Sequence, residues 1–311
     1  MNNTRNTIGG KYMSSKRRNI NKKEFIIEKF LQGFTLLTVL TTIAIVVILS
    51  KESFIFFKDI GIVRFFTEKS WTPLLEPKHF GIMPLLNGTL IIGVTAIIIA
   101  IPIGLGAAIY LSEYAPKKVK NILKPMVEIL AGIPSIVYGY FALTFITPLL
   151  QKIFPNIEIF NALSAGIAVG IMIIPMISSL SEDAMSSISS SVRDGAYALG
   201  ATKLEVVTKI VIPGAISGII SSFILAISRA IGETMIVAIA AGSRPSLTLN
   251  PLKSIQTITG YMVNVAMGDV QRGTTEYQTI FAVGTVLFLL TFILNIIAKK
   301  VVKKGKELQN V

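Results

Sequence analysis

Long apolar stretches separated by shorter charged segments account for most of the chain. A helix that crosses a membrane needs roughly 20 mostly apolar residues, and six stretches reach that length with few or no charged residues. The six stretches are Phe30–Ser50, Phe80–Ser112, Ile129–Gln151, Ile159–Ser181, Ile210–Ser243 and Tyr277–Ala298. This pattern predicts an all-α polytopic membrane protein with six transmembrane helices.

The first apolar stretch is expected to remain in the protein as a transmembrane helix. The run Phe30–Ser50 is longer than the roughly 7–15 apolar residues that are typical of a secretory signal peptide. No cleavage motif of small residues precedes the charged residues Lys51 and Glu52. We therefore interpret this stretch as a retained helix rather than as a cleaved signal.

Three neighbouring stretches contain residues that interrupt or bend helices. They are Pro102, Gly104 and Gly106 in the second stretch, Gly132, Pro134 and Gly139 in the third, and Gly166, Gly170 and Pro175 in the fourth. Irregular backbone at membrane depth is tolerated only against protein or beside a water-filled cavity. Gly and Pro are also common in membrane helices in general, but their presence in three adjacent helices favours a pathway over an inert bundle.

Two pairs of glycines are spaced for close helix packing. Gly166 and Gly170 lie four residues apart, as do Gly214 and Gly218. Small residues at this spacing allow the backbones of two membrane helices to approach each other closely. We expect both pairs to face a neighbouring helix.

The composition supports lipid as the surrounding medium. Of the 311 residues 52% are hydrophobic and 15% are charged, with a mean hydropathy of +0.67, whereas soluble domains are about 25% charged. The chain has no cysteine, which excludes disulfides and thiolate chemistry. Its single histidine, His79, cannot form a histidine metal cluster and is expected to be a solvated loop side chain.

The basic residues predict the orientation in the membrane. The chain has 30 Lys and Arg residues, and 20 of them lie in the two tails and in the second and fourth connections between apolar stretches. Nine lie in the first, third and fifth connections, and Arg229 lies inside the fifth stretch. Because basic residues concentrate on the cytoplasmic side, both termini are expected in the cytoplasm. The net charge of +13 is then a topology signal facing anionic lipid, and nucleic-acid binding is not needed to explain it.

The same features predict a division of the chain into four parts. Polar, basic and Asn-rich composition predicts disorder near the N-terminus. The expected parts are a disordered basic cytoplasmic tail over 1–29, the first transmembrane helix and an extracytoplasmic loop over 30–84, a membrane core over 85–298, and a second basic cytoplasmic tail over 299–311.

The connection over 182–213 is predicted to lie in the cytoplasm and to form two short helices. Ser189–Ser191 offers an N-cap for the first helix, Asp194 is expected in its first turn, and Gly200 suits its end. The second helix begins with Thr202-x-x-Glu205, which matches a capping box, and Pro213 is expected to close the element. Two helices joined at a glycine corner would result.

An apolar knob on this corner suggests a protein partner. Ala196, Tyr197 and Leu199 are expected to face the cytoplasm, and exposed apolar patches commonly mark interaction sites. The glycines at 195 and 200 could be mistaken for a phosphate-binding loop, but the Lys that must follow the second Gly is missing. If ATP drives this protein, another chain must bind it.

The connection resembles the EAA loop of ABC importer permeases. That loop reads Glu-Ala-Ala, then a Gly, then Ile-x-Leu-Pro, and here the matching residues are Asp194, Gly195, Ala196, Gly200, Ile210, Ile212 and Pro213. Asp replaces Glu, Gly replaces the first Ala, and Ile replaces Leu, while the spacing is intact. The resemblance implies that the loop docks onto an ATP-hydrolysing subunit, with Tyr197 and Leu199 in the same docking element.

Four further segments resemble permeases of the Pst phosphate system. Leu130–Gly139 resembles a signature shared by both permeases of that system, and three segments resemble the PstC-type subunit: Phe80–Thr89, Tyr110–Pro116 and Ser228–Met235. The resemblance implies a type-1 ABC importer permease in a bacterial or archaeal cell membrane. It implies as partners a PstA-type permease, a dimer of ATP-binding subunits that holds ATP and Mg²⁺, and an extracytoplasmic phosphate-binding protein. This chain itself would hold no cofactor and would not be an enzyme.

Arg229 and Glu233 are the candidate substrate-pathway residues. They are the only charged residues in the fifth stretch, and a charge in the middle of a membrane helix costs roughly 2.5–3.5 kcal/mol or more unless it meets a cavity or a partner. Four residues apart, they are expected to share one helix face. A fixed ion pair is one interpretation. The other is that Arg229 meets the anion and Glu233 holds Arg229 in place, as the PstC-type resemblance also implies.

Four acidic residues lie near the predicted cytoplasmic ends of the helices, at Glu113, Glu128, Glu182 and Asp183. They are either solvated interface charges or partners of basic residues that hold an inward gate.

Other functions were weighed against phosphate import. A permease of the same fold could carry another oxyanion, such as molybdate or phosphonate. An ion-coupled secondary transporter would be expected to show internal repeats with broken helices in matching halves, and no clear repeat is present. A membrane-embedded enzyme would need a cluster of His, Cys, Asp or Glu, which one His, no Cys and few buried acids do not provide.

Overall fold

The computed structural model describes the backbone of residues 6–309 and the side chains of residues 24–302. The chain divides into two units, Met1–Glu52 and Ser53–Val311. Six helices are long and apolar enough to cross a membrane, which confirms the predicted number. These spans are Glu24–Ile60, Met83–Tyr114, Ser135–Ile153, Ala162–Ser186, Lys203–Ile231 and Thr275–Val302.

The first unit consists of one helix over the residues that the structure describes. Helix α1 (Asn6–Ile60) begins far before the apolar stretch and continues into the second unit. Residues 1–5 lie outside the described part, and the disorder expected over 1–29 stays a prediction. Once a helix is nucleated, each added residue gains a hydrogen bond, so the polar segment continues the helix of the apolar one.

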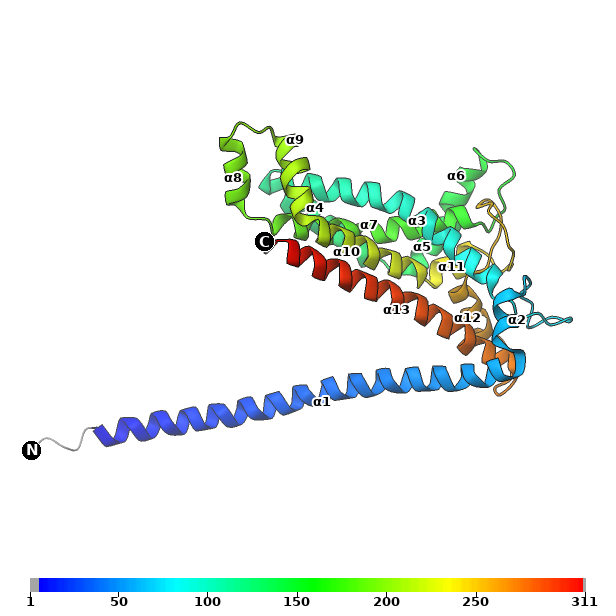
Figure 1. Ribbon diagram of the computed structural model, residues 1–311, viewed down its shortest axis with the longest axis horizontal. Coiled ribbons are helices and arrows are strands. Elements are labelled where there is room, and N and C mark those ends of the chain that lie inside the picture. Colours follow the sequence, from blue (N-terminus) through cyan, green and yellow to red (C-terminus); the bar gives the residue numbers. More distant parts are fainter. Residues whose placement is uncertain (1–5, 310–311) are drawn as a thin grey trace, which may run out of the picture. The chain divides into compact units, whose positions relative to one another are not determined.

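The second unit consists of helices and the loops that connect them, and in its described part it has one isolated β-bridge, between Trp71 and Phe80. Its remaining helices appear in Figure 1: α2 (Ile62–Thr67), α3 (Met83–Ile109), α4 (Lys117–Ala131), α5 (Ser135–Phe141), α6 (Thr147–Gln151), α7 (Ala162–Ser186), α8 (Ser190–Ala198), α9 (Lys203–Val206), α10 (Ile212–Ile231), α11 (Met235–Ala240), α12 (Ile258–Met267) and α13 (Thr275–Gln309). Three π-type turns cover Tyr110–Tyr114, Ala142–Ile146 and Val207–Val211.

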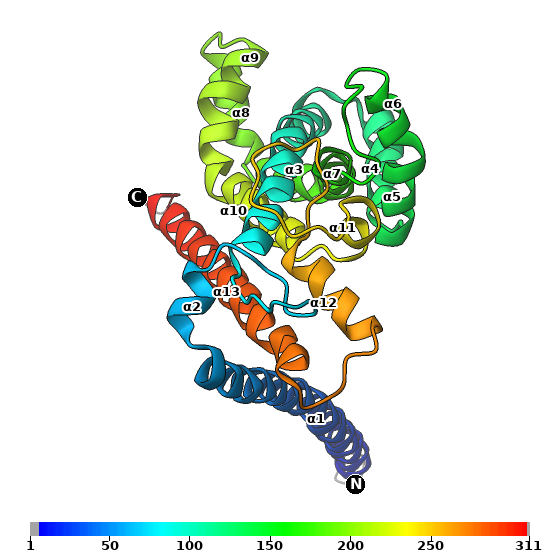
Figure 2. The same cartoon turned by 90° about the vertical axis from the view of Figure 1, so that its right-hand side faces the viewer.

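Helix α7 lies at the centre of the second unit and packs along α3 (Figure 2). Gly166 approaches α3 so closely that a Cβ atom there would lie 2.6 Å from Cβ of Thr95. A Cβ on Gly104 of α3 would lie 2.8 Å from Cγ2 of Ile177. The expected close packing of the first glycine pair is thus confirmed, and α3 and α7 form a tightly joined pair.

The second glycine pair also packs closely. A Cβ on Gly218 of α10 would lie 2.5 Å from Cβ of Ala184 on α7. The Ser181 and Ser222 hydroxyls share a hydrogen bond of 2.8 Å across the same seam. Helix α10 therefore packs along the second half of α7.

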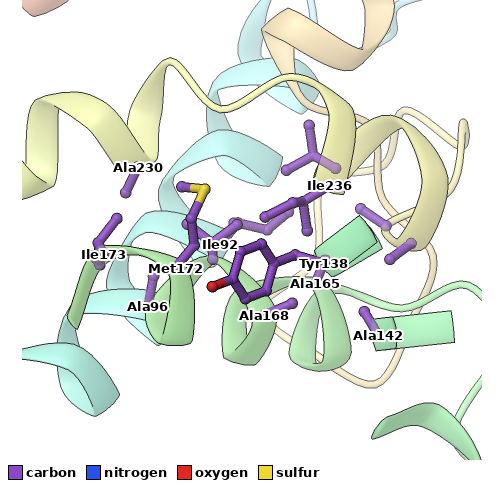
Figure 3. Close-up of a cluster of buried hydrophobic side chains, with 14 of the residues drawn as sticks. Ile92, Ala96, Tyr138, Ala142, Ala165, Ala168, Met172, Ile173, Ala230 and Ile236 are labelled. Atoms are coloured by element: carbon purple, nitrogen blue, oxygen red, sulfur yellow. The ribbon is translucent and has the colours of Figure 1, made fainter. Parts of the chain in front are cut away.

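A buried apolar cluster surrounds α7, as Figure 3 shows. Met172 and Ile173 of α7 meet Ile92 of α3 and Tyr138 of α5. The Tyr138 hydroxyl donates a hydrogen bond of 2.8 Å to the carbonyl oxygen of Leu130. The cluster fixes the middle of α7, which lines the groove described below.

A second cluster, rich in aromatic rings, lies at the end of the unit away from α8 and α9. Trp71 packs edge-on against Tyr261 with ring centroids 4.9 Å apart. His79 sits beside this cluster and hydrogen-bonds through Nδ1 to Glu68 at 2.5 Å. The expectation that His79 is merely solvated is wrong, because a carboxylate partner in the same loop holds its ring.

Most of the expected helix breakers do not break helices. Helix α3 continues through Pro102 and α7 continues through Pro175. The third stretch is interrupted at Gly132–Pro134, between α4 and α5. A break that was not expected follows Ile231, where α10 ends at Gly232 within the fifth stretch.

Pro213 does not close the cytoplasmic element as expected. The π-type turn Val207–Val211 ends just before it, and Pro213 occupies the first turn of α10. A proline lacks a backbone N–H, which costs little in the first turn of a helix, where that group has no intrahelical acceptor. The helix therefore runs from α9 into α10 with one wide turn.

Candidate functional site

A groove on the second unit contains Arg229. It has a volume of about 410 Å³ and is lined by Glu128 and Ala131 of α4, by Met172, Pro175, Met176, Ser179 and Leu180 of α7, and by Arg229 of α10. The spacing of the α7 residues places them on one helix face. The groove combines a mostly apolar wall with one cation and one carboxylate.

Arg229 lies in the last turn of α10 and is exposed in this chain. A cation is favoured there because the C-terminal end of a helix carries partial negative charge. Among the side chains that the structure describes, no carboxylate lies within ion-pair distance of Arg229. Arg229 therefore lines the groove without an ion-pair partner among the described side chains.

Glu233 has a different role from the one expected. Because α10 ends at Ile231, Glu233 lies beyond the helix, and the prediction that it shares a helix face with Arg229 is wrong. Its carboxylate accepts hydrogen bonds from the backbone N–H groups of Met235 at 3.0 Å and Ile236 at 3.2 Å. These are the first two residues of α11, so Glu233 caps that helix.

A cluster of ion pairs joins α4 to the end of α7. Glu182 is 2% exposed and accepts from Lys120 Nζ at 2.5 Å and from Lys124 Nζ at 2.6 Å. Lys124 also pairs with Asp183 at 2.9 Å, and Ser186 donates to Glu182 at 2.7 Å. The structure favours pairing with basic residues for Glu182 and Asp183 and for Glu113, which pairs with Arg193, whereas Glu128 is exposed and has no ion pair within the described residues.

The connection between α7 and α10 contains two short helices, α8 and α9, that meet at Gly200, and this confirms the prediction. Ser189 accepts from the backbone N–H of Ser191 and caps α8. Gly200 has φ of +84°, the left-handed conformation that glycine adopts at helix ends. The capping box of Thr202 and Glu205 is present in full.

Two details of this connection differ from the prediction. Asp194 lies in the second turn of α8, since the helix begins at Ser190. Ala196 is buried against Ala108 of α3 and Met185 of α7 rather than facing outward. A small apolar side chain on the inner face of a short helix packs inward, because that face is the one that meets the membrane helices.

The outer face of the connection still presents apolar side chains. Tyr197 is 41% exposed and Leu199 is 90% exposed, and Leu204 of α9 adds a third apolar group at 63%. Asp194 and Gly195 are exposed beside them, and Ile210 and Pro213 lie farther along the chain. We call Tyr197, Leu199 and Leu204 the outer patch of the connection.

Arg193 is a residue that the sequence interpretation did not single out. Its Nη2 atom donates to Glu113 Oε1 at 2.9 Å and to the Met185 carbonyl at 2.8 Å, and Nη1 donates to the Ile188 carbonyl. The local pattern did not reveal it, because Ala196, three residues later, was itself expected to face outward. In the structure both residues face inward, since residues three apart on a helix share a face.

Comparison with known proteins identifies the family. Residues 100–306 match the family described as binding-protein-dependent transport system inner membrane component. The chain is 30% identical to a probable ABC transporter permease protein, YqgH, of Bacillus subtilis over 295 residues, 94% of this chain and 95% of that protein. It is 34% identical to the phosphate transport system permease protein PstC of Mesorhizobium japonicum over 257 residues, 76% of each chain.

Solved structures share the fold. A bacterial alginate ABC transporter matches with a TM-score of 0.62 at 14% identity, over 89% of this chain and 94% of that chain. The methionine ABC transporter MetNI in an inward-facing conformation matches with a TM-score of 0.53 at 17% identity, over 72% and 94%. The expected all-α ABC importer permease fold and the resemblance to PstC-type permeases are confirmed. The chain is a multi-pass membrane protein that belongs to the family of binding-protein-dependent transport system inner membrane components.

Proposed function

We propose that this chain is a permease subunit of an ATP-driven importer that carries inorganic phosphate into the cell. The observation that carries the proposal is its identity of 34% with a phosphate transport system permease protein PstC over three-quarters of both chains. A second relative of that name, from Haemophilus influenzae, is 32% identical over 88% of this chain. Phosphate import is favoured over import of molybdate or phosphonate on this ground.

Arg229 is the group in the chain best suited to meet the anion. A guanidinium offers planar, paired N–H donors that match the oxygens of a phosphate, and it remains charged at physiological pH. It opens into the groove between α4, α7 and α10. Glu128, on the same groove, would limit how tightly an anion is held there, since like charges repel.

The exposure of Arg229 points to a second permease subunit. A charged side chain in a membrane-spanning helix faces a cavity or a partner rather than lipid. Without a partner subunit, Arg229 of this chain is exposed. A PstA-type permease placed against the groove would enclose it. The phosphate would then pass between the two permeases.

The outer patch and the residues around it form the docking surface for an ATP-binding subunit. Asp194, Gly195 and the buried Ala196 shape α8, Gly200 sets the corner, and Ile210 and Pro213 connect the corner to α10. A dimer of ATP-binding subunits, which would hold ATP and Mg²⁺, docks on this chain and on its partner. A phosphate-binding protein delivers phosphate on the opposite face, and both termini lie in the cytoplasm.

Reconstitution tests the proposal. The chain is purified with its second permease and ATP-binding subunits, placed in liposomes, and supplied with a phosphate-binding protein and radiolabelled phosphate. We expect uptake that requires ATP and that excess molybdate or phosphonate does not compete away. Uptake driven by an ion gradient without ATP would support a secondary transporter instead, and stronger competition by another oxyanion would assign that oxyanion as the substrate.

A further inference from the structure

Arg193 bonds to two other helical segments at once. We propose that it is a positioning residue that fixes α8 to the paired ends of α3 and α7, so that movement of α8 reaches the groove of Arg229. The inference rests on the proposed function, because it assumes that an ATP-binding subunit moves α8. It names the residue that transmits that movement into the membrane.

The contacts of Arg193 are buried and charge-assisted. Its side chain is 17% exposed, and the carboxylate of Glu113, 2.9 Å away, is 5% exposed. The guanidinium also binds the carbonyl oxygens of Met185 and Ile188. Met185 lies in the last turn of α7 and Ile188 lies just beyond the helix, and the Met185 carbonyl also accepts from the backbone N–H of Ile188. One side chain thus caps α7 and pairs with the end of α3.

Glu113 is held in a fixed position to receive Arg193. It lies in the π-type turn Tyr110–Tyr114 that directly follows α3, and Ser112 donates a hydrogen bond of 2.8 Å to its Oε1 atom. Turns of this kind inside helices occur frequently at functional sites. Next to it, Lys203 of α9 lies over the Tyr114 ring with Nζ 4.8 Å from the centroid.

The two helices that Arg193 joins are packed closely. The backbones of α3 and α7 approach each other at Gly104, Gly166 and Gly170, and because close-packed interiors transmit strain we expect the pair to move together. Helix α7 also supplies Met172, Pro175, Met176, Ser179 and Leu180 to the groove. A displacement of α8 that passes through Arg193 therefore reaches the α7 wall of the groove that Arg229 also lines.

The chain connection from α8 to α10 is less direct. It passes the left-handed Gly200 and the π-type turn Val207–Val211 before α10 begins. A glycine corner and a wide turn can absorb a rotation that a continuous α-helix would transmit. The side-chain contact of Arg193 consequently supplies the rigid link that the backbone lacks.

Uptake per ATP hydrolysed tests the link in the reconstituted complex. In Arg193→Met the alkyl stem remains and the donors are lost, and in Glu113→Gln the charge of the acceptor is lost. We expect phosphate uptake per ATP to fall by roughly 5- to 150-fold, the usual range of coupling between sites, while ATP hydrolysis continues. Lys209→Gln removes the exposed pair of Lys209 with Glu205 and is expected to leave the ratio unchanged.

A distance measurement tests the link without relying on a variant that weakens the complex. The chain has no cysteine, so spin labels at Ser190→Cys on α8 and Tyr110→Cys beside α3 report on these two sites alone. We expect the mean distance between the labels to be the same in the nucleotide-free and ATP-trapped complexes. When Arg193→Met is added, we expect the distribution of distances to broaden. A change of separation between the two states in the otherwise native complex would overturn the proposal.

The outcomes separate this inference from the function on which it rests. If the native complex does not take up phosphate with ATP, the proposed function fails. If the native complex does so and Arg193→Met has the same uptake per ATP, the inference about Arg193 fails while the function stands. If Arg193→Met does not assemble, the distance between the spin labels in the otherwise native complex tests the inference. An equal distance in the two nucleotide states supports it, and a changed distance overturns it.

Discussion

A guanidinium in a membrane-spanning helix must meet water, an anion or a carboxylate, because lipid offers no acceptor. Arg229 lies in the groove, and no described carboxylate is paired with it. Glu233, four residues later, has its carboxylate committed to two backbone N–H groups. The two charges that look alike in the sequence therefore have separate surroundings, Arg229 at the groove and Glu233 on the backbone of α11.

Arg229→Gln is expected to reduce phosphate uptake by at least about tenfold while the complex still assembles. A hydrogen bond to a charged group contributes about 1.5–3 kcal/mol, and about 1.4 kcal/mol corresponds to tenfold. Arg229→Lys should also be impaired, because an ammonium lacks the paired donors. Uptake in liposomes and subunit composition by size exclusion are measured together, with the exposed loop variant Arg272→Gln as control. Native uptake by assembled Arg229→Gln would remove Arg229 from the pathway.

Glu233→Gln and Glu233→Ala separate a capping role from a charge role. Glutamine keeps an oxygen that accepts from the N–H groups of Met235 and Ile236, whereas alanine loses the cap at a cost of about 0.5–2 kcal/mol. We therefore expect uptake close to native for Gln and a lower melting temperature with reduced uptake for Ala. Equal impairment of both variants would show that the negative charge of Glu233 is required.

At the scale of elements, Gly200 and Gly195 form a matched pair in the same connection. A Cβ at either site would meet open space, but Gly200 has φ of +84° and Gly195 is helical. Gly200→Val should cost about 1–2 kcal/mol in backbone conformation and should weaken association with the ATP-binding subunit. Gly195→Ala should be neutral or slightly stabilising toward folding. Co-purification of the ATP-binding subunit with each variant measures the difference.

A Gly200→Val chain that retains native assembly and uptake would contradict the docking role of the corner. Gly200→Asn provides a further comparison, because Asn tolerates the left-handed conformation better than Val does. Its assembly is expected to lie between those of the native chain and Gly200→Val. This order follows from backbone conformation alone, since no side-chain clash is involved.

Glu182 is the acidic centre of the ion pairs between α4 and α7. Removing it in Glu182→Ala leaves Lys120 and Lys124 without their shared carboxylate. The cost is about 3 kcal/mol, the lower end for broken buried pairs, because both ammonium groups are still about 30% exposed. We expect a lower melting temperature of the complex and an inward gate that leaks phosphate without ATP. Unchanged stability and no leak would assign Glu182 to neither role.

The pH dependence of this cluster follows from Lys124. The hydrogen bonds that Lys124 donates to Glu182 and Asp183 raise its pKa above the ordinary value of 10.5. A raised pKa means that the stabilisation is fully present below 10.5 and is lost only as the pH rises through the higher value. The melting temperature should therefore show no contribution from Lys124 between pH 6 and pH 9, which differential scanning fluorimetry measures. A transition within that range that Lys124→Met removes would contradict this assignment.

Several elements could be predicted because local pattern decides them. The capping box at Thr202 and the corner at Gly200 depend on residues a few positions apart, and the structure confirms both. The end of α10 at Ile231 could not be predicted, because the apolar run continues through the break and only packing of Thr259 on the Glu233 carbonyl reveals it. The inward position of Arg193 likewise depends on where α8 meets α3 and α7.

At the scale of the whole molecule, the six spans follow from the apolar runs, because length and hydropathy alone decide whether a helix can cross a membrane. Short helices depend on packing and are harder to predict. Helix α12 has only ten residues and was not expected. It is held by Tyr261, which packs on Trp71 and shares a hydrogen bond with Thr279. The groove of Arg229 similarly needs three helices that are distant in the sequence.

Orientation in the membrane is a property of the whole chain, and the absence of cysteine makes it directly measurable. Single cysteines at Lys118 and Lys209 lie on exposed sites at one end of the spans, and those at Lys152 and Arg272 lie on exposed sites at the other. Because Lys and Arg predominate on the first side, we expect that side in the cytoplasm. A membrane-impermeant thiol reagent should label Lys152→Cys and Arg272→Cys in intact cells, and Lys118→Cys and Lys209→Cys only after permeabilisation. The opposite pattern would invert the orientation.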